Sequence, residues 1–217
     1  MTATDESQYD ARQRICEYGR GLLADNLTTG TGGNLSTRID TDHIAISPSG
    51  IPYEEIEPPD VPIVRTDGTV VDGSADPSTE LPMHLAVYER RSDVGGVVHT
   101  HSPYATTFAA LGEPIPASHY LVAFAGSEVP VAPYTTHATE ALGETAVDAL
   151  GDEYNATLLA NHGVLAAAES LDDAYTVAQM VEYCARIHYQ ASVVGDPEIL
   201  PDEELGRLRE KLSAYGQ

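Results

Sequence analysis

The chain has 217 residues, with 34 acidic and 11 basic side chains and a formal net charge of −23 at pH 7, which excludes nucleic acid and anionic membranes as partners. Its apolar runs are too short to cross a membrane, and its polar N-terminus is unlike a signal peptide, so we expect a cytoplasmic protein. No internal repeat or low-complexity linker divides it, so we expect one domain over residues 1–217.

The expected elements mix helices with short strands. Helices are expected over residues 7–25, 80–91, 103–111, 137–150, 171–193 and about 202–215. Between the first two lies a strand-rich region with a hairpin signal at residues 66–69, and Ser170 is expected to cap the long helix that follows it. The order shows no regular alternation of strand and helix. It favours an α/β fold in which helices cover both sides of a sheet with much antiparallel pairing.

The stretch VVHTHSPYA, residues 97–105, places two histidines two residues apart at the end of an expected strand. Residues i and i+2 of a strand point to the same face, so His99 and His101 should lie side by side. Ser102 is expected to cap the next helix and Pro103 to begin it. From this stretch alone, a metal site and two ordinary histidines are equally good interpretations.

A third histidine, His162, lies in an Asn-His-Gly trio between two apolar runs, where Gly163 allows an unusual backbone conformation. By itself the trio is more typical of a tight turn. Together with His99 and His101 it completes three imidazoles. Three protein ligands with an open position are typical of a catalytic divalent metal site, most often zinc.

Glu80 begins an expected helix, where the helix dipole favours an acidic residue in the first turn. That structural explanation suffices for an ordinary glutamate. Near an open metal position, however, the carboxylate would act as a fourth ligand or as a general base. His84, four residues on, would share its helix face and could orient it.

Three loops are rich in hydroxyl side chains and glycine: TTGTGGNLS, SPSGIP and DPST. Each alone is an ordinary turn, but together they could bind a phosphate group through backbone N–H groups and hydroxyls. None of them contains lysine, and arginine appears only beyond them, at Arg38.

The remaining composition restricts the chemistry. The single lysine, Lys211, lies in an amphipathic helix near the C-terminus, which argues against Schiff-base catalysis. Cys16 and Cys184 are expected to pack as small hydrophobic residues in a reducing compartment. The acidic residues are scattered along the whole chain, which we interpret as a surface adapted to high salt.

The order and spacing of the chain's conspicuous segments match class II L-fuculose-phosphate aldolases, over the segments GTGGN, SPSGIPYE, PSTE, VVHTHS, IPASHY, APY and ATLLANHG. The chain therefore resembles the aldolase II/adducin family from about Cys16 to Tyr215-Gly216. This resemblance implies a three-layer α/β/α fold around a largely antiparallel sheet. It also implies a homotetramer with four-fold symmetry and active sites at the subunit interfaces.

The resemblance also implies roles for single residues. His99, His101 and His162 match the zinc ligands, and Glu80 matches the acid/base glutamate, which also approaches the metal in the substrate-free enzyme. The residues that match the phosphate cradle are Thr31, Gly33, Asn34, Ser49, Gly50, Ser78 and Thr79. Zn²⁺ is the implied cofactor, although the sequence does not distinguish it from other divalent metals.

Two tyrosines complete the implied site. Tyr120 matches a tyrosine contributed by a neighbouring subunit, and Tyr215 matches a tyrosine of the mobile tail. The implied reaction is the reversible cleavage of L-fuculose 1-phosphate, or a related ketose 1-phosphate, to dihydroxyacetone phosphate and an aldehyde. Glu80 would exchange the proton at the nucleophilic carbon, and Tyr120 would handle the proton on the aldehyde-derived oxygen.

Three alternatives stay open. Pentulose-5-phosphate 4-epimerases typically carry aspartate where this chain has Glu80, whereas methylthioribulose-1-phosphate dehydratases keep a glutamate there. A metal-free, adducin-like assembly scaffold would not require all three histidines and Glu80. The identity of the aldehyde is also left open.

Overall fold

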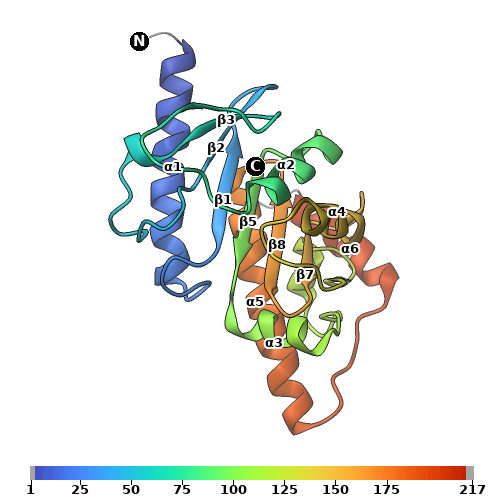
Figure 1. The fold of residues 1–217 in the computed structure, drawn as a ribbon. Helices are drawn as coiled ribbons and strands as arrows, with labels where there is room; N and C mark the ends of the chain where they lie inside the picture. Colours follow the sequence, from blue (N-terminus) through green and yellow to red (C-terminus); the bar gives the residue numbers. More distant parts are fainter. Residues whose placement is uncertain (1–2, 214–217) are drawn as a thin grey trace.

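The computed structural model describes residues 3–213, and the side chains of residues 7–211. Its centre is one eight-stranded sheet (Figure 1). The strands are β1 (Asn34–Arg38), β2 (His43–Ile46), β3 (Ile63–Arg65), β4 (Val70–Asp72), β5 (Gly96–Thr100), β6 (Val131–Ala132), β7 (Ala156–Leu159) and β8 (Gly163–Ala168). Their order is β4-β3-β2-β1-β5-β8-β7-β6. Strands β6 and β7 pair in parallel, and the other neighbours pair antiparallel.

Helices cover both faces of this sheet. They are α1 (Ala3–Ala24), α2 (Leu81–Arg90), α3 (Pro103–Leu111), α4 (Glu140–Leu150), α5 (Leu171–Val194) and α6 (Asp202–Ser213), with 3₁₀ turns η1 (Pro58–Asp60) and η2 (Tyr120–Phe124). Helices α1, α3 and α5 pack on one face, and α2 and α4 pack on the other (Figure 1). The expected three-layer α/β/α fold with a largely antiparallel sheet is confirmed.

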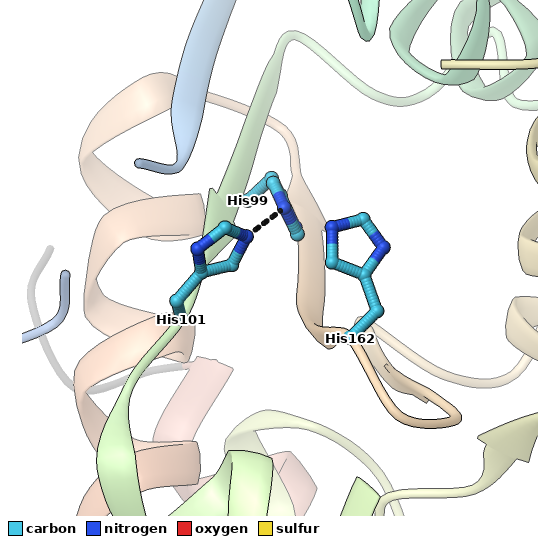
Figure 2. Close-up of side chains that lie close together, drawn as sticks. All are labelled: His99, His101 and His162. Carbon is cyan, nitrogen blue, oxygen red and sulfur yellow. Dashed lines mark hydrogen bonds between the residues drawn. The ribbon is translucent and has the colours of Figure 1, made fainter. Parts of the chain in front are cut away.

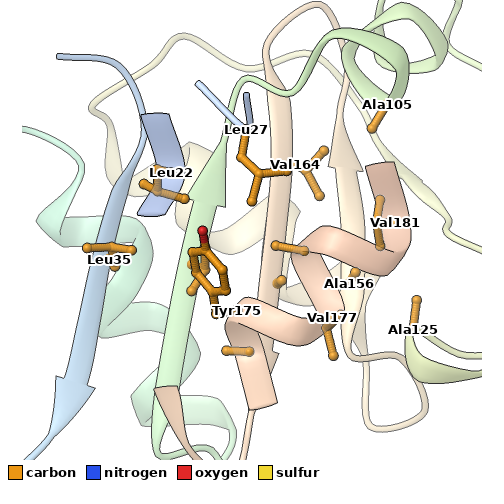
Figure 3. Packing of buried hydrophobic residues seen from close by; sticks show 14 of the residues in the cluster. Leu22, Leu27, Leu35, Ala105, Ala125, Ala156, Val164, Tyr175, Val177 and Val181 are labelled. Atoms are coloured by element: carbon orange, nitrogen blue, oxygen red, sulfur yellow. The ribbon is translucent and has the colours of Figure 1, made fainter. Parts of the chain in front are cut away.

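The alternation of side chains along each central strand supplies both cores. In β8, Val164 and Ala166 belong to the core under α5, while Leu165 belongs to the core under α2 and α4. All of these side chains are fully buried. Figure 3 shows Val177 and Val181 of α5 packed over the sheet. A strand covered on both faces is apolar at every position, as the run GVLAAA is.

Most expected helix boundaries within the described residues agree with the structure to within one residue, and two helix starts differ. Helix α3 spans the expected residues, and the Ser170 hydroxyl caps α5 by accepting the Asp173 N–H at 3.1 Å. Helix α4 begins at Glu140 and not at residue 137, because Thr139 caps it by accepting the N–H of Leu142. Helix α1 begins at Ala3, four residues earlier than expected.

Ser102 occupies the N-cap position of α3, but its side chain makes no capping bond. The Glu182 carboxylate of α5 takes that role, accepting the backbone N–H groups of Tyr104 at 3.0 Å and Ala105 at 2.9 Å. A cap supplied by a residue far along the chain leaves no local signal in the sequence.

The structure also meets the expectations for the hairpin, the two cysteines and the lysine. Strands β3 and β4 form the hairpin expected at residues 66–69, with Gly68 at φ 89°. Cys16 and Cys184 are buried and unbonded to each other, and Lys211 lies exposed on α6. Within residues 3–213, no helix combines the length and the apolar character needed to cross a bilayer.

Candidate metal centre

Two of the three histidines come from the end of β5, a fully buried strand between β1 and β8. His99 Nδ1 lies 2.8 Å from the carbonyl oxygen of Val164 on β8. A carbonyl oxygen only accepts, so Nδ1 carries a proton and Nε2 is the ring nitrogen left to face a metal ion. That Nε2 lies 3.0 Å from His101 Nε2 (Figure 2). The expected side-by-side arrangement of His99 and His101 is confirmed.

The third histidine, His162, lies in the turn between β7 and β8. The left-handed backbone of this turn falls on Asn161, at φ 57°, and not on Gly163 as the sequence led us to expect. Asparagine tolerates this conformation better than most residues. Gly163 is required for space instead, because a Cβ there would lie 2.3 Å from the carbonyl oxygen of Thr100 and 3.0 Å from Cδ2 of His101.

The turn brings the three imidazoles together. The ring centroid of His162 lies 4.8 Å from that of His99 and 5.2 Å from that of His101, and the three rings converge on one space (Figure 2). One ligand nitrogen from each ring lies within 4.8 Å of the others. Burial and the nearby His99 lower the pKa of both His101 and His162 to about 4, so both rings are neutral at pH 7.

These three residues fit a divalent metal ion. Metal binding requires neutral imidazoles with lone pairs directed at one point. The His99 Nδ1–H bond to a backbone carbonyl is the kind of outer contact that fixes a ligand's tautomer. Moreover, Nδ1 of His162 and Oε1 of Glu80 are buried with no hydrogen-bond partner within the described residues. Buried polar atoms without a hydrogen-bond partner need an explanation. A bound ion or substrate that contacts these atoms would provide one.

Glu80 occupies the N-cap position just before α2, and not the first helical turn, but its side chain makes no capping bond. Its carboxylate turns toward the histidines instead, with Oε2 3.1 Å from His99 Nε2 and Oε1 3.4 Å from His162 Nε2. The amide of Asn34 donates to Oε2 at 2.8 Å. Burial raises the pKa of Glu80, but the adjacent His99 and the Asn34 bond outweigh it and hold the pKa below its usual range.

The three hydroxyl-rich loops meet beside the histidines. Ser47 joins them, because its hydroxyl accepts the Leu35 N–H at 3.1 Å and its carbonyl accepts the Ser78 N–H at 3.0 Å. Gly33, at φ 70°, lets the first loop pass close to β5, where a Cβ would lie 2.7 Å from the His99 carbonyl oxygen. Of the expected cradle residues, Thr31, Ser49, Gly50 and Thr79 are exposed, and Asn34 and Ser78 are buried.

A model of the Class II Aldolase and Adducin N-terminal domain matches residues 13–189, a range that contains the three histidines, Glu80 and all three loops. The chain belongs to this class II aldolase and adducin family. A 5-deoxy-D-ribulose 1-phosphate aldolase from Bacillus thuringiensis serovar kurstaki is 46% identical over 207 residues, covering 95% of this chain and 97% of that protein.

Two further comparisons agree with this membership. A 5-methylthioribulose-1-phosphate/5-deoxyribulose-1-phosphate aldolase from Rhodospirillum rubrum is 37% identical over 97% of this chain and 94% of that protein. A solved structure of an L-fuculose 1-phosphate aldolase superimposes with a TM-score of 0.90 at 44% identity, covering 94% of this chain and 96% of that chain.

Of the two tyrosines expected at the site, the structure describes Tyr120, which is not part of the cluster described above. Tyr120, on η2, is 48% exposed, and its ring packs against His119. Its expected role, in a neighbouring subunit's site, stays a prediction. Tyr215 lies outside the described residues.

The structure also adds residues that the sequence did not single out. The Thr28 hydroxyl, in the first loop, is buried and has no hydrogen-bond partner in the described part of the chain. Ser36 and Tyr88 form a buried hydrogen-bonded group with His84 next to Asn34. The contact between Asn34 and Glu80 depends on the register of β1 against β5, which places Asn34 opposite His99. The sequence alone does not give this register.

Proposed function

We propose that this protein is a metal-dependent aldolase that cleaves a ketose 1-phosphate to dihydroxyacetone phosphate and an aldehyde. The observation that carries the proposal is the convergence of three imidazoles with the Glu80 carboxylate 3.1 Å from one of them, beside three hydroxyl-rich loops. Membership of the class II aldolase family supports it.

His99, His101 and His162 would hold the metal, with Glu80 within reach of the same space. Zinc is the ion most typical of three imidazole ligands with an open position, and other divalent metals fit the same donors. A divalent ion in this position supplies Lewis acidity for the negative charge that develops on the substrate oxygens.

Glu80 would carry the proton of the reaction. Its lowered pKa keeps it ionised, so in the synthetic direction it takes a proton from the nucleophilic carbon of dihydroxyacetone phosphate, and in cleavage it returns that proton. Oε1, which has no hydrogen-bond partner among the described residues, is the oxygen available for this transfer. Tyr120 of a neighbouring subunit would handle the proton on the aldehyde-derived oxygen, and Tyr215 would contact the substrate from the tail.

The substrate's phosphate would lie among the three loops, held by neutral donors. The proposed cradle consists of Thr31, Gly33, Asn34, Ser49, Gly50, Ser78 and Thr79. Hydroxyls and backbone N–H groups can bind a phosphate without a lysine. The Asn34 amide nitrogen carries two hydrogens, so it can donate to Glu80 and to a substrate oxygen together.

A 5-deoxypentulose 1-phosphate is our first choice of substrate, ahead of L-fuculose 1-phosphate. The 46% identical relative is named for 5-deoxy-D-ribulose 1-phosphate, and the 37% identical relative shares that substrate in its name. Cleavage of this ketose between C3 and C4 yields dihydroxyacetone phosphate and acetaldehyde. L-fuculose 1-phosphate is the second candidate, favoured by the solved structure with a TM-score of 0.90.

The proposal extends to the assembly and its setting. A homotetramer with interface active sites would bring Tyr120 of one subunit to the histidines of another. The exposed side chains of Tyr120, Tyr183 and Tyr189, on η2 and α5, offer aromatic surface for such contacts. The cytoplasm is the proposed location. The net charge of −23 supports a salt-rich setting, where self-repulsion is screened.

The test is a coupled assay of dihydroxyacetone phosphate release in molar salt, with both ketose 1-phosphates, with and without a chelator. Release should stop with the chelator and return with added zinc. Glu80→Gln should lower kcat by about 10²- to 10⁴-fold, the usual contribution of an acid/base group. Glu89→Gln, an exposed glutamate at the other end of α2, is the matched control and should stay active. Chelator-resistant release, or a fully active Glu80→Gln, would refute the proposal.

A further inference from the structure

Two rows of polar side chains meet in the layer between β1 and α2. Glu80, just before α2, and His84 and Tyr88 within it are spaced four residues apart, so all three lie on one side of the helix. Asn34 and Ser36 are two residues apart on β1, so they share one face of the sheet. All five are at most 6% exposed, in a layer where Met83 and Val87 are packed apolar side chains. Buried polar groups at such a density call for a specific explanation.

The five side chains form one continuous chain of hydrogen bonds. Asn34 Nδ2 lies 2.8 Å from Glu80 Oε2, and Asn34 Oδ1 lies 2.6 Å from His84 Nε2. His84 Nδ1 lies 2.6 Å from the Ser36 hydroxyl, which lies 2.8 Å from the Tyr88 hydroxyl. The chain thus runs from the candidate metal centre to the far end of α2.

The carboxylate at one end fixes the direction of every bond. An ionised Glu80 only accepts, so Asn34 must donate to it through Nδ2 and present Oδ1 to His84. His84 must then carry its proton on Nε2, which leaves Nδ1 to accept from Ser36. The Ser36 oxygen in turn accepts the O–H of Tyr88. Reversing any one bond would place two acceptors or two donors face to face.

The other end of the chain is anchored as well. The Arg38 guanidinium lies 4.7 Å from the centre of the Tyr88 ring, and its Nη2 donates to the Tyr88 carbonyl oxygen at 3.1 Å. Burial raises the pKa of Tyr88, so the hydroxyl keeps the proton that it donates. Tyr88 is therefore held in place as the terminal donor.

We propose that His84, Ser36 and Tyr88 are positioning residues that act through Asn34 to hold the Glu80 carboxylate against the metal centre. Without the His84 bond, the Asn34 amide can turn and present its oxygen to the carboxylate, which would move Glu80 away from its place beside His99. This role rests on the proposed function of Glu80 as the proton carrier. It predicts a loss that falls mainly on the rate, because the three histidines and the other cradle residues are left intact and only Asn34 belongs to both the cradle and the chain.

Two substitutions of His84 distinguish a positioning role from a packing role for this residue. Glutamine at position 84 can place its amide nitrogen where Nε2 of the histidine lies and so keep the bond to Asn34. The shorter asparagine side chain reaches only the position of Nδ1 and so loses that bond. We expect His84→Asn to lower kcat by about 10- to 100-fold, as the loss of an outer partner does, with a smaller change in KM and unchanged zinc content. His84→Gln should restore most of that loss. Equal losses of kcat in both variants would overturn the proposal. So would a loss of activity that comes mainly from a higher KM or a lower zinc content.

Tyr88→Phe provides a milder test, because it removes only the hydroxyl at the far end. We expect kcat to fall with unchanged KM, by less than in His84→Asn. Tyr175→Phe is the matched control, since it removes a buried hydroxyl that donates to Asp25 at 2.7 Å. Tyr175→Phe should keep the wild-type kcat. Equal kcat values in Tyr88→Phe and in wild type would remove Tyr88 from the proposed chain.

A second readout does not depend on the reaction. In the solid-state ¹⁵N spectrum of histidine-labelled protein, the resonances lost in His84→Gln identify His84. They should show a neutral ring protonated at Nε2. A ring protonated at Nδ1 would contradict the chain directly. If the wild type cleaved no ketose phosphate, the proposed function would fail, and this spectrum would still decide whether the chain of bonds exists.

Discussion

The two faces of the sheet differ although they share the same strands. Under α1, α3 and α5 the buried side chains form one large apolar core, shown in part in Figure 3. Under α2 the buried layer is polar where β1 and β5 approach the helix, at Asn34, Ser36 and His99. Two neighbouring residues of β5 show this difference: Val98 belongs to the apolar core on one face, and His99 contacts Glu80 on the other. Strand alternation therefore lets one element stabilise the fold on one face and build the site on the other.

The largest effect should follow from removing a ligand on the polar face. His99→Ala should abolish metal binding and lower kcat/KM by about 10³-fold or more, because the Lewis acid contributes several kcal/mol to the transition state. Metal analysis by mass spectrometry, together with the coupled assay, checks this. Wild-type zinc content in His99→Ala would show that the cluster is not the metal site.

Shortening a side chain on the apolar face should instead lower stability and leave activity unchanged. Ile15 is fully buried in α1 within the core under α5. Ile15→Ala should lower the free energy of unfolding by about 2–5 kcal/mol through lost burial and a residual cavity. Denaturant unfolding measures this loss, and kcat per folded molecule should stay at the wild-type value. A large fall in kcat would show that the two faces are not separable.

The turn that carries His162 connects β7 to β8 and leaves no space for a side chain at position 163. Gly163→Ala should lower the free energy of unfolding by about 1–3 kcal/mol, because its Cβ would lie 2.3 Å from a backbone oxygen, and it should weaken zinc binding by displacing His162. Gly206→Ala in α6 is the matched control, since nothing lies within 4 Å of its Cβ. It should stabilise the protein by about 0.5–1 kcal/mol. Equal effects of the two substitutions would contradict this account of the turn.

The polar face should also make stability depend on pH. Burial is the main reason that the pKa of His84 is lowered to about 3. The unfolded chain binds a proton near the ordinary pKa of about 6.5, whereas the folded chain does not, so the free energy of unfolding falls as pH decreases from about 6.5 toward 3. The loss reaches about 1.4 kcal/mol per pH unit for this one proton.

Denaturant unfolding of chelator-treated protein, at about pH 7 and about pH 5, measures this dependence. His84→Gln has no titrating ring at this position and should lose less stability between the two values. An identical loss in the variant and the wild type would show that His84 is not the source.

How much of the site the sequence predicts depends on which interactions are local. The pairing of His99 with His101 follows from strand periodicity, and the position of His162 in a turn follows from the apolar runs around it. The bond from Asn34 to Glu80 depends on the register between β1 and β5, which no local pattern records. The cap that Glu182 provides for α3 likewise joins residues about 80 positions apart.

The central claim is that the three histidines hold a catalytic metal ion. Equilibrium dialysis of chelator-treated protein against zinc tests it most directly, with His162→Ala as the comparison and molar salt to support the acidic chain. The account predicts one zinc ion bound per wild-type chain and a large loss of affinity in His162→Ala. Zinc binding that is equal in the two proteins, or absent from the wild type, would contradict it.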